Sequence, residues 1–152
     1  TIAWMAGDDD AVGLLEAWRQ EVFEHVPAAF RLNVVAWATP IAVDHRLTEI
    51  AADLVAELQP HRGKWASWSV EIVDRLVDHC LGALEIVLGD TESGVATLQT
   101  AVADYRKAGT RARLTDALAD LAVLAGDDDA RTEALTLAEE LGMKGVTARL
   151  TA

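Results

Sequence analysis

The side chains best suited to metal chemistry are four histidines and a single cysteine. They are His25, His45, His61, His79 and Cys80. A zinc site needs three or four converging protein ligands, usually supplied as closely spaced pairs. No His-x3-His pair occurs. Because His79 and Cys80 are adjacent in a predicted helix, they point about 100° apart around its axis. The spacing therefore predicts no metal site.

Two runs of three aspartates, at 8–10 and 127–129, are candidates for calcium because carboxylates are its preferred ligands. The EF-hand pattern D-x-[DN]-x-[DN]-G with a closing glutamate does not occur. Each run stands before a predicted helix, where a carboxylate accepts a hydrogen bond from a free backbone N–H and stabilises by ~1 kcal/mol. We interpret both runs as helix caps.

The motifs of covalent catalysis are absent from the sequence. Neither G-x-S-x-G nor S-x-x-K occurs. Cys80 falls on an apolar helical face, where a buried structural thiol is expected. Carboxylates are numerous, but on an acidic helical surface they are mostly solvated. We therefore predict no catalytic residue, no cofactor and no enzyme activity in this chain.

Five tryptophans dominate the aromatic content. Three fall in predicted helices and are expected in the core, namely Trp4, Trp18 and Trp37. Trp65 and Trp68 lie beside Arg62 and Lys64 in the irregular segment 60–69. The simplest interpretation is that this segment folds onto the helices. The alternative is an aromatic contact for a partner or ligand, because Trp and Arg are enriched at binding hot spots. We hypothesise that the segment borders a binding surface.

The elements that must position these residues are helices over almost the whole chain, since apolar residues recur at helical spacing. We predict helices at 2–6 (the end of a longer one), 10–25, 28–45, 48–58, 69–88, 91–108, 111–125 and from the cap at 127–129 to 141, with a further start at 145–152. Pro40 lies inside the segment 28–45, so this helix either bends or consists of two short helices. Gly89, Gly126 and Gly142 are predicted to end helices.

The hairpin predicted at 81–109 resembles a tetratricopeptide repeat of degenerate type. The matching positions hold small or apolar residues where two helices must approach closely: Leu81, Gly82, Gly94, Leu98 and Ala101, with Gly89 and Asp90 as the turn. The departures are Asp78, Glu85 and Arg106, where Trp, Tyr and Pro belong. The string GDDDA occurs at 7–11 and again at 126–130, and Gly126 follows Gly89 by 37 residues, close to the ~34 of the standard repeat.

The segment 54–150 is similar to the C-terminal helical-repeat region of large actinobacterial transcriptional regulators. The similar features are LVAELQPHRG, the repeat described above and the ending ALTLAEELGMKGVTARL. Those regulators carry a signal-responsive P-loop ATPase module, often with a LuxR-type helix-turn-helix or a nucleotide-cyclase domain. No P-loop motif occurs in this chain. For this part of such a protein, the resemblance implies a sensor or docking arm.

Charge and composition exclude several function classes. The 152 residues carry a net charge of −12, whereas nucleic acids and anionic membranes are bound through basic surfaces. The longest uncharged apolar run, 32–43, is too short to span a bilayer. One cysteine and no recognisable signal peptide favour the cytoplasm. The chain begins without Met and in mid-helix, so we expect a fragment of a longer protein.

We therefore predict an all-α fold, a tetratricopeptide-like stack of antiparallel helical hairpins (an α-solenoid) forming a single domain over 1–152. Its hairpins are expected at 1–26 (incomplete), 28–59, 69–108 and 111–142.

The predicted function is a protein-interaction or signal-sensing module of a cytoplasmic regulator, which binds a protein partner or other domains of the same chain through the first helix of each hairpin. Two alternatives are a small-molecule effector sensor with a pocket at the Pro40 kink, and an oligomerisation scaffold. The predicted partner-binding residues are Arg31, Asn33, Trp37, Arg62, Trp65, Trp68, Glu71, Arg75 and Asp78.

Overall fold

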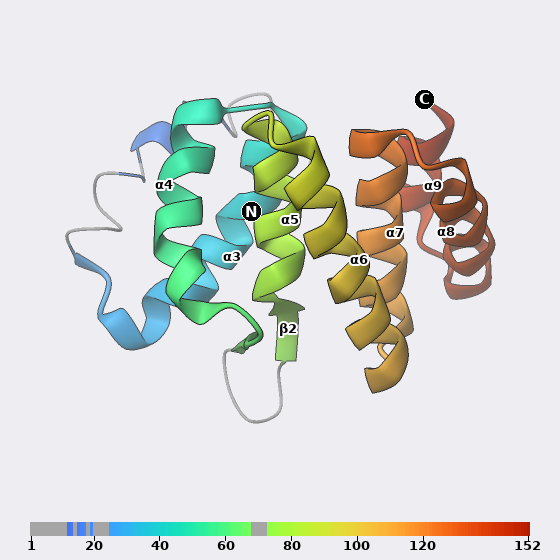
Figure 1. Cartoon of the computed structure of the whole chain (residues 1–152), viewed down its shortest axis with the longest axis horizontal. Helices are drawn as coiled ribbons and strands as arrows, with labels where there is room; N and C mark the ends of the chain where they lie inside the picture. Colours follow the sequence, from blue (N-terminus) through green and yellow to red (C-terminus); the bar gives the residue numbers. More distant parts are fainter. Residues whose placement is uncertain (1–11, 14, 18, 20–24, 68–72) are drawn as a thin grey trace.

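The described chain is helical apart from one small sheet, as a computed structural model shows (Figure 1). It describes residues 12–13, 15–17, 19, 25–67 and 73–152, and at positions 28, 29, 73 and 74 the backbone only. The helices are α3 (Ala28–Asp44), α4 (Thr48–Leu58), α5 (Val77–Val87), α6 (Thr91–Ala108), α7 (Arg111–Ala125), α8 (Asp128–Leu141) and α9 (Lys144–Thr151). A short 3-10 helix, η1 (Gln59–His61), follows α4. The predicted all-α class is confirmed at this level.

Helices that follow one another in the chain pack against one another, from α3 and α4 to α8 and α9 at the other end of the long axis (Figure 1). Helices two apart also make contact, namely α3 with α5, α5 with α7, and α7 with α9. The buried apolar residues form two clusters, one among α3, α4 and α5 and one among α6, α7, α8 and α9. Every second helix, α3, α5, α7 and α9, therefore contacts the next one of this series.

Glycine allows α5 and α6 to approach most closely. A Cβ atom on Gly82 would lie 2.8 Å from the Gly94 carbonyl oxygen, and a Cβ atom on Gly94 would lie 2.6 Å from the Gly82 carbonyl oxygen. Such distances are well inside van der Waals contact, so a larger residue at either position would push the two backbones apart. The close approach predicted from the small residues of this hairpin is confirmed.

Helix ends follow the capping residues of the sequence. Asp90 accepts a hydrogen bond from the backbone N–H of Ser93, and Asp127 accepts one from Ala130. Gly126 and Gly142 end α7 and α8 in the left-handed conformation, which favours glycine. The cap predicted at 127–129 is thus confirmed, whereas the aspartates at 8–10, together with Trp4 and Trp18, lie outside the described residues.

Two predictions about the middle of the chain need correction. The helix expected from residue 69 begins only at Val77, because residues 73–76 form the strand β2 (Val73–Leu76), which pairs antiparallel with β1 (Trp65–Ser67). The segment expected to be irregular therefore contains η1 and β1. Of the two alternatives for Pro40, the division into two short helices is ruled out, since α3 runs through this residue as one helix.

Within the described part of the chain, no helix combines the length and the apolar character needed to cross a membrane.

Candidate functional site

A cleft of about 510 Å³ lies where four helices and one strand converge. Its volume is within the ~300–1,000 Å³ that is usual for small-molecule sites. The helices are α3, α5, α7 and α9, which alternate along the chain with the helices that do not reach the cleft. The lining residues are Thr39, Pro40, Val43, Asp44, Arg75, His79, Ala83, Asp116, Asp120, Gly145, Val146 and Arg149.

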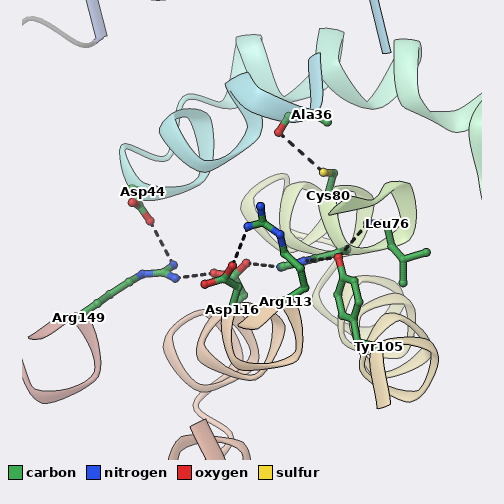
Figure 2. Close-up of polar contacts among 10 residues, drawn as sticks. Ala36, Asp44, Leu76, Cys80, Tyr105, Arg113, Asp116 and Arg149 are labelled. Carbon is green, nitrogen blue, oxygen red and sulfur yellow. Dashed lines mark hydrogen bonds and ion pairs between the residues drawn. The ribbon is translucent and has the colours of Figure 1, made fainter. Parts of the chain in front are cut away.

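A buried hydrogen-bonded chain adjoins this cleft and begins at His79, which has no solvent-exposed surface. Its Nε2 lies 2.8 Å from Oδ2 of Asp120, and its Nδ1 lies 3.1 Å from the hydroxyl oxygen of Tyr105. The same hydroxyl oxygen accepts a hydrogen bond of 2.9 Å from the backbone N–H of Leu76 (Figure 2). Tyr105 is therefore free to donate its own proton to Nδ1, and Nε2–H donates to Asp120. This pattern assigns a neutral imidazole protonated at Nε2.

The electrostatics agree with a neutral His79. Burial lowers the pKa of His79, and the positive charge of Arg75 lowers it further, although the hydrogen bond to Asp120 acts in the opposite direction. Burial also raises the pKa of Tyr105, so its hydroxyl keeps its proton. For Asp120, burial acts to raise the pKa, but hydrogen bonds from His79 and Arg149 hold it well below its usual range. Asp120 is therefore a buried carboxylate with a full negative charge.

Arg149 of α9 links this chain to the opposite side of the cleft. Its Nη1 donates to Oδ1 of Asp120 at 2.6 Å. Its Nη2 lies 3.1 Å from Oδ1 of Asp44, the last residue of α3, as Figure 2 shows. Burial lowers the pKa of Arg149, but the two carboxylates outweigh this effect and raise it. A second pair lies one turn away on α7, where Arg113 donates to Asp116 at 3.0 Å. Through Arg149, ion pairs thus connect α9 with α7 and with α3 around the cleft.

Arg75 enters the cleft from β2, where it pairs with Ala66 of β1. The residue is partly buried, and its Nε is shielded from solvent with no hydrogen-bond partner among the described residues. Burial lowers the pKa of Arg75, but acidic groups around it, including Asp116 and Asp120, raise it by more. The guanidinium therefore stays charged, although those two carboxylates are hydrogen-bonded to other donors.

Of the residues predicted to bind a partner, Arg75 lines the cleft. Three others lie on α3 away from it: Arg31 is near Glu57, Asn33 donates from Nδ2 to the Ser67 carbonyl at 2.7 Å, and Trp37 is 39% exposed. The expectation that Trp37 lies in the core is therefore wrong. Trp68 and Glu71 lie outside the described residues.

The remaining predicted residues have structural partners. Arg62 forms an ion pair with Glu85 and lies 3.7 Å from Asp78, whose carboxylate also accepts the Gly63 backbone N–H. Trp65 packs edge-on against the Tyr105 ring, with centroids 5.5 Å apart. These contacts are those of a loop folded onto the helices, the simpler of the two interpretations of this segment.

Sequence reasoning did not single out His79 as a hydrogen-bonding residue, nor Asp120, Arg149, Asp44 or Asp116. One signal was present for Asp120. It stands between Leu118 and Leu121 on the apolar side of α7, where an acidic residue requires a buried partner. The partner itself could not be found from spacing, because His79 and Arg149 are far away in the sequence.

The cleft can bind and orient a ligand. It combines apolar surface from Pro40, Val43 and Val146 with charged groups in fixed positions. The hydroxyl of Thr39 donates to the Val35 carbonyl of its own helix at 3.2 Å and so is not activated as a nucleophile. In the described residues, no group of three or more His, Cys, Asp or Glu side chains is arranged to hold a metal ion.

No protein-family model, curated protein sequence or solved structure matches this chain.

Proposed function

We propose that this chain is a ligand-binding module built as a short tetratricopeptide-like stack of helical hairpins, and that its ligand occupies the cleft. The observation that carries the proposal is the origin of the cleft lining, which comes from α3, α5, α7 and α9. In a stack of hairpins these are the first helices of successive pairs, and their side chains face the concave side. The close Gly82–Gly94 approach in the pair α5 and α6 supports the same repeat type.

The size and the chemistry of the cleft favour a small molecule as its ligand. A volume of about 510 Å³ suits a compact effector better than an extended peptide. Pro40 lies in the lining, at the position where the sequence raised a small-molecule pocket as an alternative to a protein-interaction surface. The charged groups come from several helices, so a ligand that contacts them would bias how those helices sit relative to one another. This is the behaviour required of an effector sensor in a regulatory protein, as the resemblance to cytoplasmic transcriptional regulators implies.

A protein-interaction surface is the second candidate, and a different feature favours it. Phe30 is 49% exposed and Trp37 is 39% exposed, seven positions apart on α3. Residues at this spacing lie on one face of a helix, and large aromatic side chains are frequent anchors of protein interfaces. A protein partner would therefore contact α3 outside the cleft.

Filling the cleft tests the first proposal. Gly145 lines the cleft, and a Cβ atom added to it would have no heavy atom within 4 Å, so Gly145→Phe is chosen to block the cleft with a ring. Thr132→Phe is the matched control, because Thr132 is exposed on α8 away from the cleft. Both variants and the wild type are screened against a metabolite panel by thermal shift, since a ligand of the folded state raises Tm.

We expect metabolites that raise the Tm of the wild type and of Thr132→Phe but not that of Gly145→Phe. Metabolites that stabilise all three proteins equally would place the ligand elsewhere and contradict the cleft as the site. If Phe30→Ser and Trp37→Ser together abolish capture of a protein partner while Gly145→Phe does not, the second candidate is favoured.

A further inference from the structure

One nitrogen of the Arg75 guanidinium, in the lining of the cleft, lacks a hydrogen-bond partner among the described residues. This nitrogen is Nε, and it is shielded from solvent. A buried donor on a charged group is unfavourable without an acceptor. Strand pairing with Ala66 fixes the backbone of Arg75, so the side chain extends from a rigid support. Arg75 also lines the cleft and is only partly buried, so an acceptor that enters the cleft can meet the exposed part of its guanidinium.

The other charges of the cleft already satisfy one another. The Asp120 carboxylate accepts from His79 and Arg149, and Arg149 also reaches Asp44. Asp116 accepts from Arg113 on the preceding turn of α7. A ligand acid that approached Arg149 would have to displace two carboxylates, whereas the Nε of Arg75 has no acceptor among the described residues.

The lining residues also determine which net charge the ligand can carry and how polar the rest of the ligand can be. Three carboxylates (Asp44, Asp116 and Asp120) and two guanidinium groups (Arg75 and Arg149) face the cleft, so a dianion would be repelled more strongly than a monoanion. Four apolar residues provide surface for an uncharged body: Pro40, Val43, Ala83 and Val146. A planar carboxylate matches the fork of a guanidinium and forms charge-assisted hydrogen bonds with it.

We propose that the ligand is a small organic monocarboxylate whose carboxylate binds the Arg75 guanidinium and whose apolar body packs against Pro40, Val43 and Val146. This inference rests on the proposed function, that of a ligand-binding module with its site in the cleft, and adds the class of ligand and the residue that selects it. Arg75 is then the specificity-determining residue of the cleft.

Three carboxylates test the inference, each beside its uncharged amide: butyrate, hexanoate and benzoate. In ¹⁵N NMR of the wild type we expect at least one carboxylate to shift the Arg75 Nε–H resonance, and to bind about ten-fold more tightly than its amide, as is usual for a charge-assisted hydrogen bond. Inorganic sulfate, a dianion at neutral pH, should bind more weakly than that carboxylate. Arg75→Gln should reduce carboxylate affinity to that of the amide.

Two further variants complete the experiment. Arg106→Gln removes the same charge at an exposed site on α6 and should leave carboxylate affinity unchanged. Arg75→Lys keeps the charge but loses the fork, and should bind more weakly than the wild type. The Arg75 resonance is read in the wild type, so the result does not depend on the folding of a variant.

The possible failures are distinguishable. If carboxylates and amides bind equally and both lose binding in Gly145→Phe, the cleft remains the site but the carboxylate assignment is overturned. If no carboxylate shifts the Arg75 resonance, the assignment is overturned as well, while the metabolite screen still tests the cleft. If carboxylate binding survives both Gly145→Phe and Arg75→Gln, the proposed site and the role of Arg75 are both wrong.

Discussion

Nε2 of His79 and Oδ2 of Asp120 lie 2.8 Å apart and join α5 to α7 at the wall of the cleft. Because Asp120 also accepts from Arg149, one carboxylate connects α5, α7 and α9. The imidazole has no exposed surface, so its two ring nitrogens depend entirely on protein partners. The cleft is therefore held in shape by a polar network rather than by apolar packing alone.

Asp120→Asn is expected to lower the free energy of unfolding by about 3 kcal/mol, because it leaves the Arg149 cation without its buried partner. Urea unfolding followed by circular dichroism measures the change. The matched control is Asp116→Asn on the same helix, which breaks an i,i+3 pair with Arg113 and should cost less than about 1 kcal/mol. Equal losses in the two variants would contradict a special role for Asp120.

The stability of the protein should fall as the pH decreases below about 6.5, the usual pKa of histidine. The pKa of His79 is lower in the folded state than in the unfolded state, so in this window the unfolded state binds more protons. The stabilisation is complete above the unfolded pKa and is lost progressively toward the folded pKa, by at most about 1.4 kcal/mol per pH unit.

Urea titrations between pH 7 and pH 5 measure this dependence. His79→Gln should flatten the profile in that range, because the group that takes up the proton is gone. His45→Gln, at an exposed position, should leave the wild-type profile in place. A slope that persists unchanged in a folded His79→Gln protein would show that another group causes it.

Tyr105→Phe removes the acceptor of the Leu76 N–H and the donor to His79 Nδ1. We expect a loss of about 1–3 kcal/mol, the usual cost of a buried polar group left without a partner. Hydrogen exchange locates the effect, since the Leu76 amide should exchange faster while amides in the middle of α8 change only with global stability. Unchanged protection at Leu76 would be inconsistent with this hydrogen bond.

Gly82→Ala should destabilise the protein by about 1–3 kcal/mol, because the new methyl group would lie 2.8 Å from backbone atoms of α6. Gly145→Ala is the control. It also replaces a helical glycine, but its methyl group meets no atom within 4 Å, so we expect a gain of up to about 1 kcal/mol from helix propensity. Thermal unfolding of both variants gives the comparison, and a stabilised Gly82→Ala protein would refute the close approach.

Local signals predicted the helices well. Apolar residues at helical spacing, a proline, capping aspartates and helix-ending glycines act within a few residues, so they can be recognised in the sequence. The burial of Leu98, Ala101 and Tyr105 on one face of α6 follows from such spacing. The short sheet was not predicted, because the pairing of Trp65 with Leu76 and the hydrogen bond from Leu76 to Tyr105 depend on tertiary contacts.

The cleft is harder to predict, because its residues come from five separate elements. Pro40 and Arg75 were noted in the sequence, the first as a helix kink at a possible pocket and the second as a partner contact. Neither could be connected with Asp120 or Arg149, which are 41 and 29 residues from their partners His79 and Asp120. Periodicity gives the face on which a side chain lies, but the alignment of successive helices decides which faces meet.

The bridge from Arg149 to Asp44 has a consequence for how the protein unfolds. Arrays of helical hairpins interact mainly between neighbours, and their outer units can fray while the centre stays folded. Here α9 is tied to α3 and to Asp120 of α7, so detaching α9 also breaks the ion pairs of Arg149 with Asp44 and Asp120. We therefore expect cooperative loss of structure over α3–α9 instead of gradual fraying from the C-terminal end.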